Sequence, residues 1–273
     1  MSKTYDLQDL LQVMKRLRDP EDGCSWDLKQ SFQSIVPSTL EEAYEVAEAI
    51  EREDYSHLSE ELGDLLFQVI FYCQLGEEQS RFNFDQVVSG LASKLIRRHP
   101  HVFPDGSLQS RAQSDHESSD GLIKQQWEAL KEQERAAKGQ SSTLADIPLN
   151  LPALSRAQKI QKRASSVGFD WDRMDEVVAK AEEELAELKE ALALKRSQDV
   201  AEELGDLMFA VVNIARHCKQ DAESLLRAGN RKFERRFGHI ESRLTEKGSS
   251  PKLSTLAEME SLWLEAKVIE KRS

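Results

Sequence analysis

Two clusters of carboxylates in the second half of the chain have the spacing of residues that share one face of a helix. They read E-E-x-x-E at Glu183, Glu184 and Glu187, and E-E-x-x-D at Glu202, Glu203 and Asp206. Residues three and four apart are neighbours on a helix surface. A short polar run at 195–198 allows a turn between the two helices, and an antiparallel pair would then place the clusters opposite each other.

Carboxylates that face one another repel, and they cannot all stay ionised cheaply without a cation between them. The set contains neither His nor Cys, and oxygen ligands of this kind suit Mg²⁺ best, with Mn²⁺ as a possible substitute. The spacing therefore indicates a divalent metal site. The plainer alternative is a solvated acidic helix face that holds no ligand.

The first half of the chain repeats the pattern, which favours the metal site over the plainer alternative. At an offset of 142 residues stand Glu41, Glu42 and Glu45, and then Glu60, Glu61 and Asp64. Other pairs keep the same order: Trp26-Asp27 with Trp171-Asp172, Lys94, Arg97 and Arg98 with Lys232, Arg235 and Arg236, and Trp127 with Trp263. Such a repeat predicts two homologous domains.

Apolar periodicity predicts helices throughout and no convincing strand, so the fold class is all-α, with four or five helices in each of two tandem bundles. Expected features include helices at 6–18, 84–98 and 121–138, a mobile loop at 104–120, and Ser38 or Thr39 as an N-cap. Serine and proline between 139 and 152 mark a linker. The predicted domains are 1–138 and 153–273.

The stretch 204–215, LGDLMFAVVNIA, is apolar nearly all round. A helix with that pattern is typically buried. Asp206 is therefore expected to be a carboxylate in the core, where it needs a compensating cation, proton or hydrogen bond.

Composition sets limits on partners and compartment. The chain has 273 residues and a formal net charge of -12, which argues against general affinity for nucleic acid or for anionic membranes. No apolar run approaches the roughly 18 residues of a membrane span. Cys24, Cys73 and Cys218 have no metal-ligand spacing and suggest reduced thiols. A cytoplasmic location is expected.

With these motifs in hand, the chain resembles the MazG nucleoside triphosphate pyrophosphohydrolases, of the all-α NTP pyrophosphatase superfamily, in their two-domain bacterial form. The resemblance rests on the doubled acid motif, on W-D before it and on K-F-E-R-R-F after it. It implies Mg²⁺-dependent hydrolysis of nucleoside triphosphates to the monophosphate and pyrophosphate, over a broad range of bases and in a nucleotide-pool role. It also implies a homodimer.

The resemblance also suggests roles for individual residues. It gives the metal ligands as Glu184, Glu187, Glu203 and Asp206, and in the first half as Glu42, Glu45, Glu61 and Asp64. Glu183 or Glu202 is expected to orient or deprotonate the attacking water, and the choice between them is open. Candidate substrate contacts are Lys180, Asn230, Lys232, Arg235, Arg236 and Trp263.

Each substrate contact has a structural alternative. Charge-assisted hydrogen bonds from arginine suit phosphate, but a basic helix end in solvent has the same sequence. Lys180 can instead pair with a neighbouring acid, which is the favoured reading. Trp263 can stack on a base, or it can pack in the helical core. Asn230 can be a plain polar cap.

The two halves are expected to differ in activity. His99-Pro100 should end the basic helix of the first half directly after Arg98, whereas the second half continues as Phe237-Gly238. Ala92 stands where the second half has Asn230. The second half is therefore expected to carry most of the activity.

Three other functions are compatible with acidic helices. A di-iron carboxylate bundle requires Glu-x-x-His pairs, and Asp64 and Asp206 stand in those places, so it is rejected. A non-catalytic helical scaffold that binds nucleotides or a protein partner remains, although such a scaffold has no need for four converging acids in each half. A narrow enzyme for one nucleotide is the third.

Overall fold

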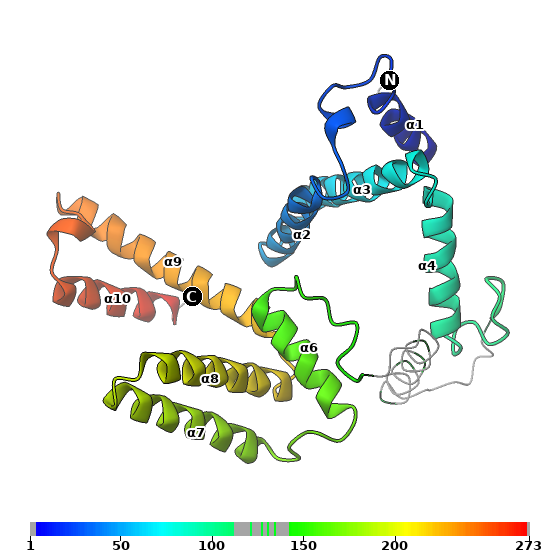
Figure 1. Cartoon of the computed structure of the whole chain (residues 1–273). Helices are drawn as coiled ribbons and strands as arrows, with labels where there is room; N and C mark the ends of the chain where they lie inside the picture. The colour runs from blue at the N-terminus through cyan, green and yellow to red at the C-terminus, as the bar shows by residue number, and fades with distance from the viewer. Residues whose placement is uncertain are drawn as a thin grey trace. The chain divides into compact units, whose positions relative to one another are not determined.

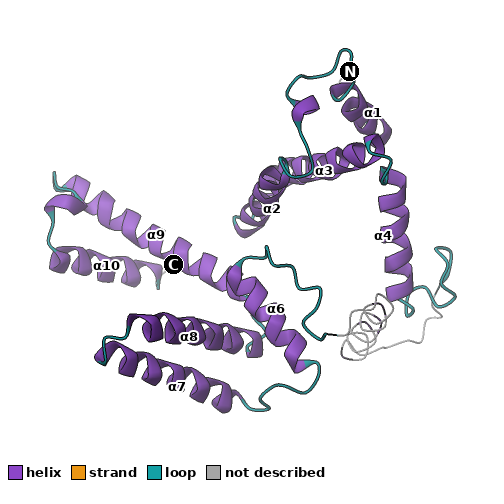
Figure 2. Cartoon of the chain, viewed as in Figure 1, coloured by secondary structure: helices purple, strands orange, loops and turns teal. Residues whose placement is uncertain are grey.

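A computed structural model of the chain describes residues 4–111, 121, 127, 130, 134 and 142–271. Within these residues the regular structure is α-helix and short 3-10 helix, with no strand (Figure 2). The chain divides into two compact units, Met1–Gln133 and Glu134–Ser273. The prediction of two tandem all-α domains is confirmed. The exact limits of the linker, 139–152, stay a prediction.

The first unit contains α1 (Leu7–Leu17), α2 (Val36–Glu51), α3 (Tyr55–Glu78) and α4 (Phe84–Arg98) (Figure 1). A capping box at its start fixes α1, with Asp6 accepting from the Asp9 amide and the Asp9 side chain accepting from the Asp6 amide. A turn through Glu53, which has a φ of 56°, reverses the chain between α2 and α3. The two longest helices of this unit therefore pack as an antiparallel pair.

The core of the first unit lies where α1 crosses the later part of α3. Its buried members are Met14, Ile35, Ile70, Phe71 and Leu75. Arg18 at the end of α1 is 8% exposed. Its guanidinium lies over the Phe71 ring and donates two hydrogen bonds to the Glu78 carboxylate, at 2.8 and 2.6 Å. This bidentate pair joins the end of α1 to the end of α3.

The second unit contains α6 (Ala153–Ser165), α7 (Met174–Ala193), α8 (Ser197–His217), α9 (Ala222–Glu246) and α10 (Leu256–Glu270). The turn between α7 and α8 passes through Lys195, whose φ is 54°. Lys195 is 142 residues after Glu53, so the two repeats reverse the chain at equivalent positions with the same backbone conformation. Helix α6 packs on α8, and α9 forms a second hairpin with α10 around Ile240, Leu244 and Leu262.

The ends of α4 and α9 and the start of α2 test three local predictions. Helix α4 ends at Arg98, before Pro100, whereas α9 continues to Glu246, and this difference is confirmed. The N-cap prediction at Ser38 or Thr39 is wrong. Helix α2 begins at Val36, and the Thr39 hydroxyl donates back to the Ile35 carbonyl at 2.9 Å. Pro37 tolerates this earlier start because its missing amide hydrogen is not needed in the first turn.

Most of two predicted segments lies outside the described residues. Of the helix expected at 121–138, residues 121, 127, 130 and 134 are described, and all four are helical. Of the loop expected at 104–120, residues 104–111 are described, and they form turns and bends.

The prediction that 204–215 is buried is wrong for the single chain. Helices α6 and α7 cover only the side of α8 that carries Ala210, Val212, Asn213 and Ala215. A stripe along another side stays exposed, with Leu204 at 41%, Met208 at 57% and Val211 at 53%. Asp206 is also exposed and is not the core carboxylate that was expected. Apolar periodicity predicts that a surface is covered, but it does not say by what.

The first repeat exposes the equivalent stripe. Leu62, Leu66 and Val69 of α3, each 142 residues before its counterpart, are 50%, 40% and 39% exposed. Among the described residues, no helix combines the length and the apolar character needed to cross a membrane.

Candidate active site

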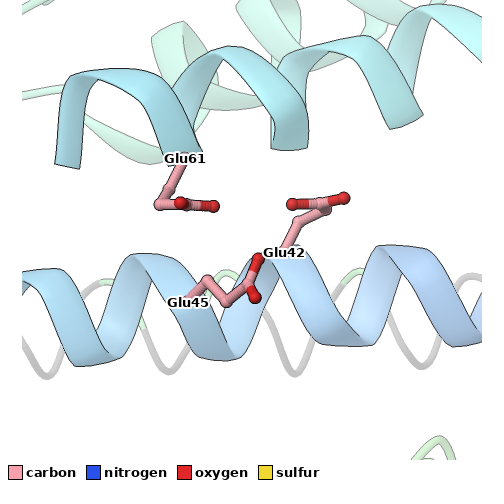
Figure 3. A group of neighbouring side chains, drawn as sticks. All are labelled: Glu42, Glu45 and Glu61. Carbon is pink, nitrogen blue, oxygen red and sulfur yellow. The ribbon is translucent and has the colours of Figure 1, made fainter. Parts of the chain in front are cut away.

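Three carboxylates of the first unit converge between two helices. Glu42 and Glu45 project from α2 toward Glu61, which projects from α3 (Figure 3). One oxygen of each side chain can be chosen so that all three lie within 4.8 Å of one another. The residues come together because the antiparallel pairing of α2 and α3 places E-E-x-x-E opposite E-E-x-x-D, as the spacing predicted.

The second unit repeats this arrangement with Glu184 and Glu187 of α7 and Glu203 of α8, also with oxygens within 4.8 Å of one another. The two groups hold six of the eight predicted ligands. Asp64 and Asp206 lie outside these groups. Each is still close enough for its charge to raise the pKa of a member, Asp64 that of Glu42 and Asp206 that of Glu203.

The electrostatics of both groups favour a bound cation. Burial, and then the charges of Glu187 and Glu184, raise the pKa of Glu203 above its usual value. Burial, followed by Asp64 and Glu45, raises the pKa of Glu42, and burial followed by Glu45 raises that of Glu61. Deprotonating such a set is costly unless positive charge compensates it. All the donors are carboxylate oxygens, which is the ligand type that Mg²⁺ and Mn²⁺ prefer.

The two acid groups have different neighbours. In the second unit the Lys180 ammonium lies 2.9 Å from Glu183 and 2.8 Å from Glu184. These acids raise the pKa of Lys180, so it is charged. In the first unit His57 Nε2 lies 3.2 Å from Glu61. Lys180 had two predicted roles, phosphate contact or acid pairing, and the structure shows it pairing with acids.

The two candidates for the general base lie beside the second group. Glu183 is exposed and accepts a hydrogen bond from Lys180, while Glu202 is exposed at the start of α8. The charge of Glu202 contributes to the raised pKa of Glu203. The geometry does not separate the two candidates.

The basic residues of α9 are not brought to the acid group by any contact within the described residues. Arg236 Nε donates to Glu270 Oε2 at 2.8 Å, and Arg235 Nη2 lies 3.6 Å from Glu270 Oε1. The hydrogen bond from Arg236 lowers the pKa of Glu270. Lys232 and Asn230 are exposed on α9.

Trp263 lies on α10 and packs against α9. Its ring centroid is 5.3 Å from that of Phe233, and the Arg236 guanidinium lies 5.3 Å from the Trp263 ring centroid. Trp263 belongs to the residues packed around Ile240, Leu244 and Leu262. In the single chain it therefore has the core-packing role that was the alternative to base stacking.

A cavity of about 420 Å³ opens next to the acid group of the second unit, among α6, α7 and α8. Lys180, Glu184 and Asp206 line it where the acids meet. Asn213 also lines it and lies two helical turns beyond Asp206 on α8, roughly 10 Å along the axis. Its apolar walls include Phe169, Trp171 and Phe209. The volume falls within the range of small-molecule sites.

Sequence reasoning singled out the charged residues of this cavity but not its two buried amides, Gln161 and Asn213. Gln161 is 7% exposed and Asn213 is 6% exposed, and both are polar side chains in the interior. One signal was present: Asn213 is the single polar side chain within the apolar run 207–215, and the first repeat has Phe71 at the matching position. Gln161 lies in a helix with ordinary polar composition and gave no such signal.

Comparison with known proteins agrees with the duplication. The MazG nucleotide pyrophosphohydrolase domain matches residues 30–103 and again residues 174–240. A nucleoside triphosphate pyrophosphohydrolase of Escherichia coli strain K12 is 48% identical over 260 residues, covering 94% of this chain and 95% of that protein. The nucleoside triphosphate pyrophosphohydrolase/pyrophosphatase MazG of Thermotoga maritima is 42% identical over 260 residues, covering 95% of each.

Proposed function

This chain belongs to the MazG nucleotide pyrophosphohydrolase family, and from that membership we propose that it hydrolyses nucleoside triphosphates to the monophosphate and pyrophosphate. The observation that carries the proposal is the pair of acid groups, one in each matched segment, whose carboxylate oxygens converge within 4.8 Å. The relatives from Escherichia coli and Thermotoga maritima are named for this activity, and this chain is similar to each of them over 95% of its length.

The ligands proposed for Mg²⁺ in the second unit are Glu184, Glu187, Glu203 and Asp206, with Mn²⁺ as a substitute. Glu42, Glu45, Glu61 and Asp64 are the equivalent set in the first unit. When bound, the ion supplies positive charge to the phosphate oxygens and makes water in the site more acidic.

The chain's own residues position the water and the substrate. Glu183 or Glu202 accepts the proton of the attacking water, since both carboxylates flank the acid group. Lys180 pairs with Glu183 and Glu184, so it limits repulsion among the acids before substrate arrives. The other candidate substrate contacts lie on the α9–α10 hairpin, and the contacts described for them are with residues of that hairpin. They are Lys232, Arg235, Arg236, Asn230 and Trp263. We propose that they contact the substrate from this hairpin.

A homodimer fits the exposed stripes. Leu204, Met208 and Val211 in one unit, and their counterparts in the other, are apolar surfaces that a second copy would remove from water. We further propose a broad base range, a nucleotide-pool role and a cytoplasmic location for the enzyme.

The test is a panel of NTPs and dNTPs with Mg²⁺, with products resolved as monophosphate plus pyrophosphate or as diphosphate plus phosphate. The proposal requires release of pyrophosphate that disappears with EDTA and returns with Mg²⁺ or Mn²⁺. Release of inorganic phosphate in place of pyrophosphate, or a rate of hydrolysis that EDTA does not lower, would contradict it. A non-catalytic scaffold would bind the nucleotides and leave them intact.

A further inference from the structure

The two repeats differ at the place where the first helix of each unit meets the long acid-bearing helix. In the second unit this place holds Asn213 of α8 and Gln161 of α6. In the first unit the residue matching Asn213 is Phe71, and Met14 of α1 is the buried residue that faces it, with both 1% exposed. Phe71 and Met14 belong to the core cluster of their unit. The second unit therefore has two amides and a cavity where the first has the Phe71 ring, packed in the core with Met14 and covered by the Arg18 guanidinium.

The hydrogen bonds of Gln161 leave one strong acceptor unused. Its Nε2 donates to the Phe209 carbonyl at 2.7 Å, which fixes the orientation of the amide. Its Oε1 is buried and has no hydrogen-bond partner among the described residues. A buried carbonyl without a donor destabilises a fold, so such a group is expected to have a partner when the protein works.

Asn213 leaves the complementary group unused. Its Oδ1 accepts from Arg216 Nε at 2.8 Å, and for its Nδ2 no partner is found in the part of the chain that the structure describes. Arg216 is held in turn by Asp170, whose carboxylate accepts from Arg216 Nη1 at 2.9 Å and from Nη2 at 2.5 Å. Arg216 is therefore a positioning residue that fixes the Asn213 amide with its donor unengaged.

The rest of the cavity has two distinct chemical regions. Lys180, Glu184 and Asp206 make one part charged, next to the proposed metal site. Phe169 and Trp171 contribute aromatic surface to the other part and are 75% and 39% exposed. A ligand that fills both regions has a polyphosphate, a flat aromatic group and a hydrogen-bonding edge. A nucleotide has this combination.

We propose that Gln161 and Asn213 read the nucleobase, with Gln161 Oε1 accepting from an N–H of the base and Asn213 Nδ2 donating to a neighbouring acceptor. Phe169 and Trp171 supply the apolar surface beside the base. This inference rests on the proposed function, because it names the base subsite of the same reaction. It also locates base recognition in the second unit, since Phe71 of the core cluster takes the position of Asn213 in the first.

The experiment measures kcat/KM for ATP, GTP, CTP and UTP with the full-length protein and Mg²⁺. In Asn213→Asp the unused donor becomes an acceptor while the bond from Arg216 is kept. The ratio of kcat/KM between the four bases is therefore expected to change by about tenfold or more. Asn213→Phe installs the residue of the first repeat, and Gln161→Met removes the unused acceptor. We expect the former to lower every kcat/KM by about a hundredfold, because Phe71 shows that a phenyl ring fills this position.

Two controls keep the result interpretable. Asn150→Asp makes the same chemical change at an exposed residue that does not line the cavity, and it should leave the base ratios unchanged. Mn²⁺ binding, followed by electron paramagnetic resonance, reports whether the acid group of each variant is still assembled.

The outcomes separate the two proposals. Base ratios that stay within twofold of wild type in both Asn213→Asp and Gln161→Met, with pyrophosphate still released, overturn the base subsite and leave the activity standing. No pyrophosphate from any nucleotide with the wild-type chain overturns the proposed function itself. A variant that loses Mn²⁺ binding as well as base discrimination also counts against the subsite, because the residue then supports the fold and does not read the base.

Discussion

The Lys180 ammonium lies 2.8 Å from a carboxylate oxygen of Glu184, which is one of the three acids that converge in the second unit. Lys180 therefore compensates part of the negative charge that the proposed metal ion would otherwise compensate. The equivalent acids of the first unit have His57 as their neighbour, which lies one turn before Glu61 on the same helix, α3, and contacts it. The two groups should consequently respond differently when this neighbouring side chain is removed.

Removing Lys180 should strengthen metal binding. In Lys180→Met, a positive charge next to a proposed ligand is lost, and Mn²⁺ affinity at the second unit should rise by about fivefold, allowing for screening of a side chain that is 36% exposed. Titration followed by electron paramagnetic resonance measures the change. Lys189→Met, at an exposed lysine further along α7, is the matched control. Weaker Mn²⁺ binding in Lys180→Met would show that the lysine assembles the site.

Mutations in the two acid groups should show which repeat carries the activity. Glu203→Gln is expected to lower kcat by about a hundredfold or more, because it removes a charge from the proposed metal site. Glu61→Gln should leave kcat within about twofold, because in the first unit the buried Phe71 ring takes the position of Asn213. Steady-state release of pyrophosphate is the measurement. Loss of activity in Glu61→Gln alone would reverse the assignment of the active half.

The Arg18–Glu78 pair should make the stability of the first unit depend on pH. The hydrogen bond from Arg18 lowers the pKa of Glu78 below its usual value of 4.5. Its stabilising effect is therefore complete above pH 4.5 and is lost as pH falls through the lowered pKa. Glu78→Gln should lower the free energy of unfolding by about 2 kcal/mol at pH 7, because it leaves a buried guanidinium with a weaker partner.

Thermal unfolding of Glu78→Gln and wild type between pH 7 and pH 3 tests this, and the difference between them should shrink at the acidic end. Glu77→Gln is the neighbouring control. The Glu77 pair with Lys15 is exposed on both sides, at 47% and 50%, and should contribute little. A difference between Glu78→Gln and wild type that stays constant down to pH 3 would remove the ion pair as its cause.

A charge in the exposed stripe of α8 should weaken the proposed dimer. Met208 is 57% exposed in the single chain and lies between Leu204 and Val211. Met208→Lys is expected to raise the dimer dissociation constant by about a hundredfold, because a charge buried in an apolar interface is costly. Analytical ultracentrifugation measures the dissociation constant. Leu253→Lys, at a side chain that is 79% exposed, should have no effect. An unchanged dissociation constant in Met208→Lys would place the interface elsewhere.

Helical spacing is what made the fold and the acid groups predictable. Residues three and four apart share one face of a helix. With short connections at 52–54 and 194–196 between the paired helices, this spacing is enough to bring Glu184 opposite Glu203. A second local rule is that proline disfavours helix at the residue before it. That rule predicted that α4 ends before Pro100, whereas α9 continues. These are local constraints, and local constraints can be read from one chain.

Contacts between distant helices were not predictable in the same way. Nothing near Arg236 in the sequence indicates that Glu270 is its partner, 34 residues later. The apolar pattern of α8 showed that its surface needed cover, but the chain itself leaves Met208 exposed. The cavity arises from three helices and from amides whose importance depends on what surrounds them, so Gln161 gave no signal.

The cavity of the second unit has a thermal consequence. Where Met14 and Phe71 fill the interior of the first repeat, the second has an opening and a buried carbonyl without a donor. We therefore expect the second repeat to unfold at the lower temperature in the resting protein. A ligand that enters the opening binds the native state alone, and it raises the melting temperature of that half in proportion to the logarithm of its concentration.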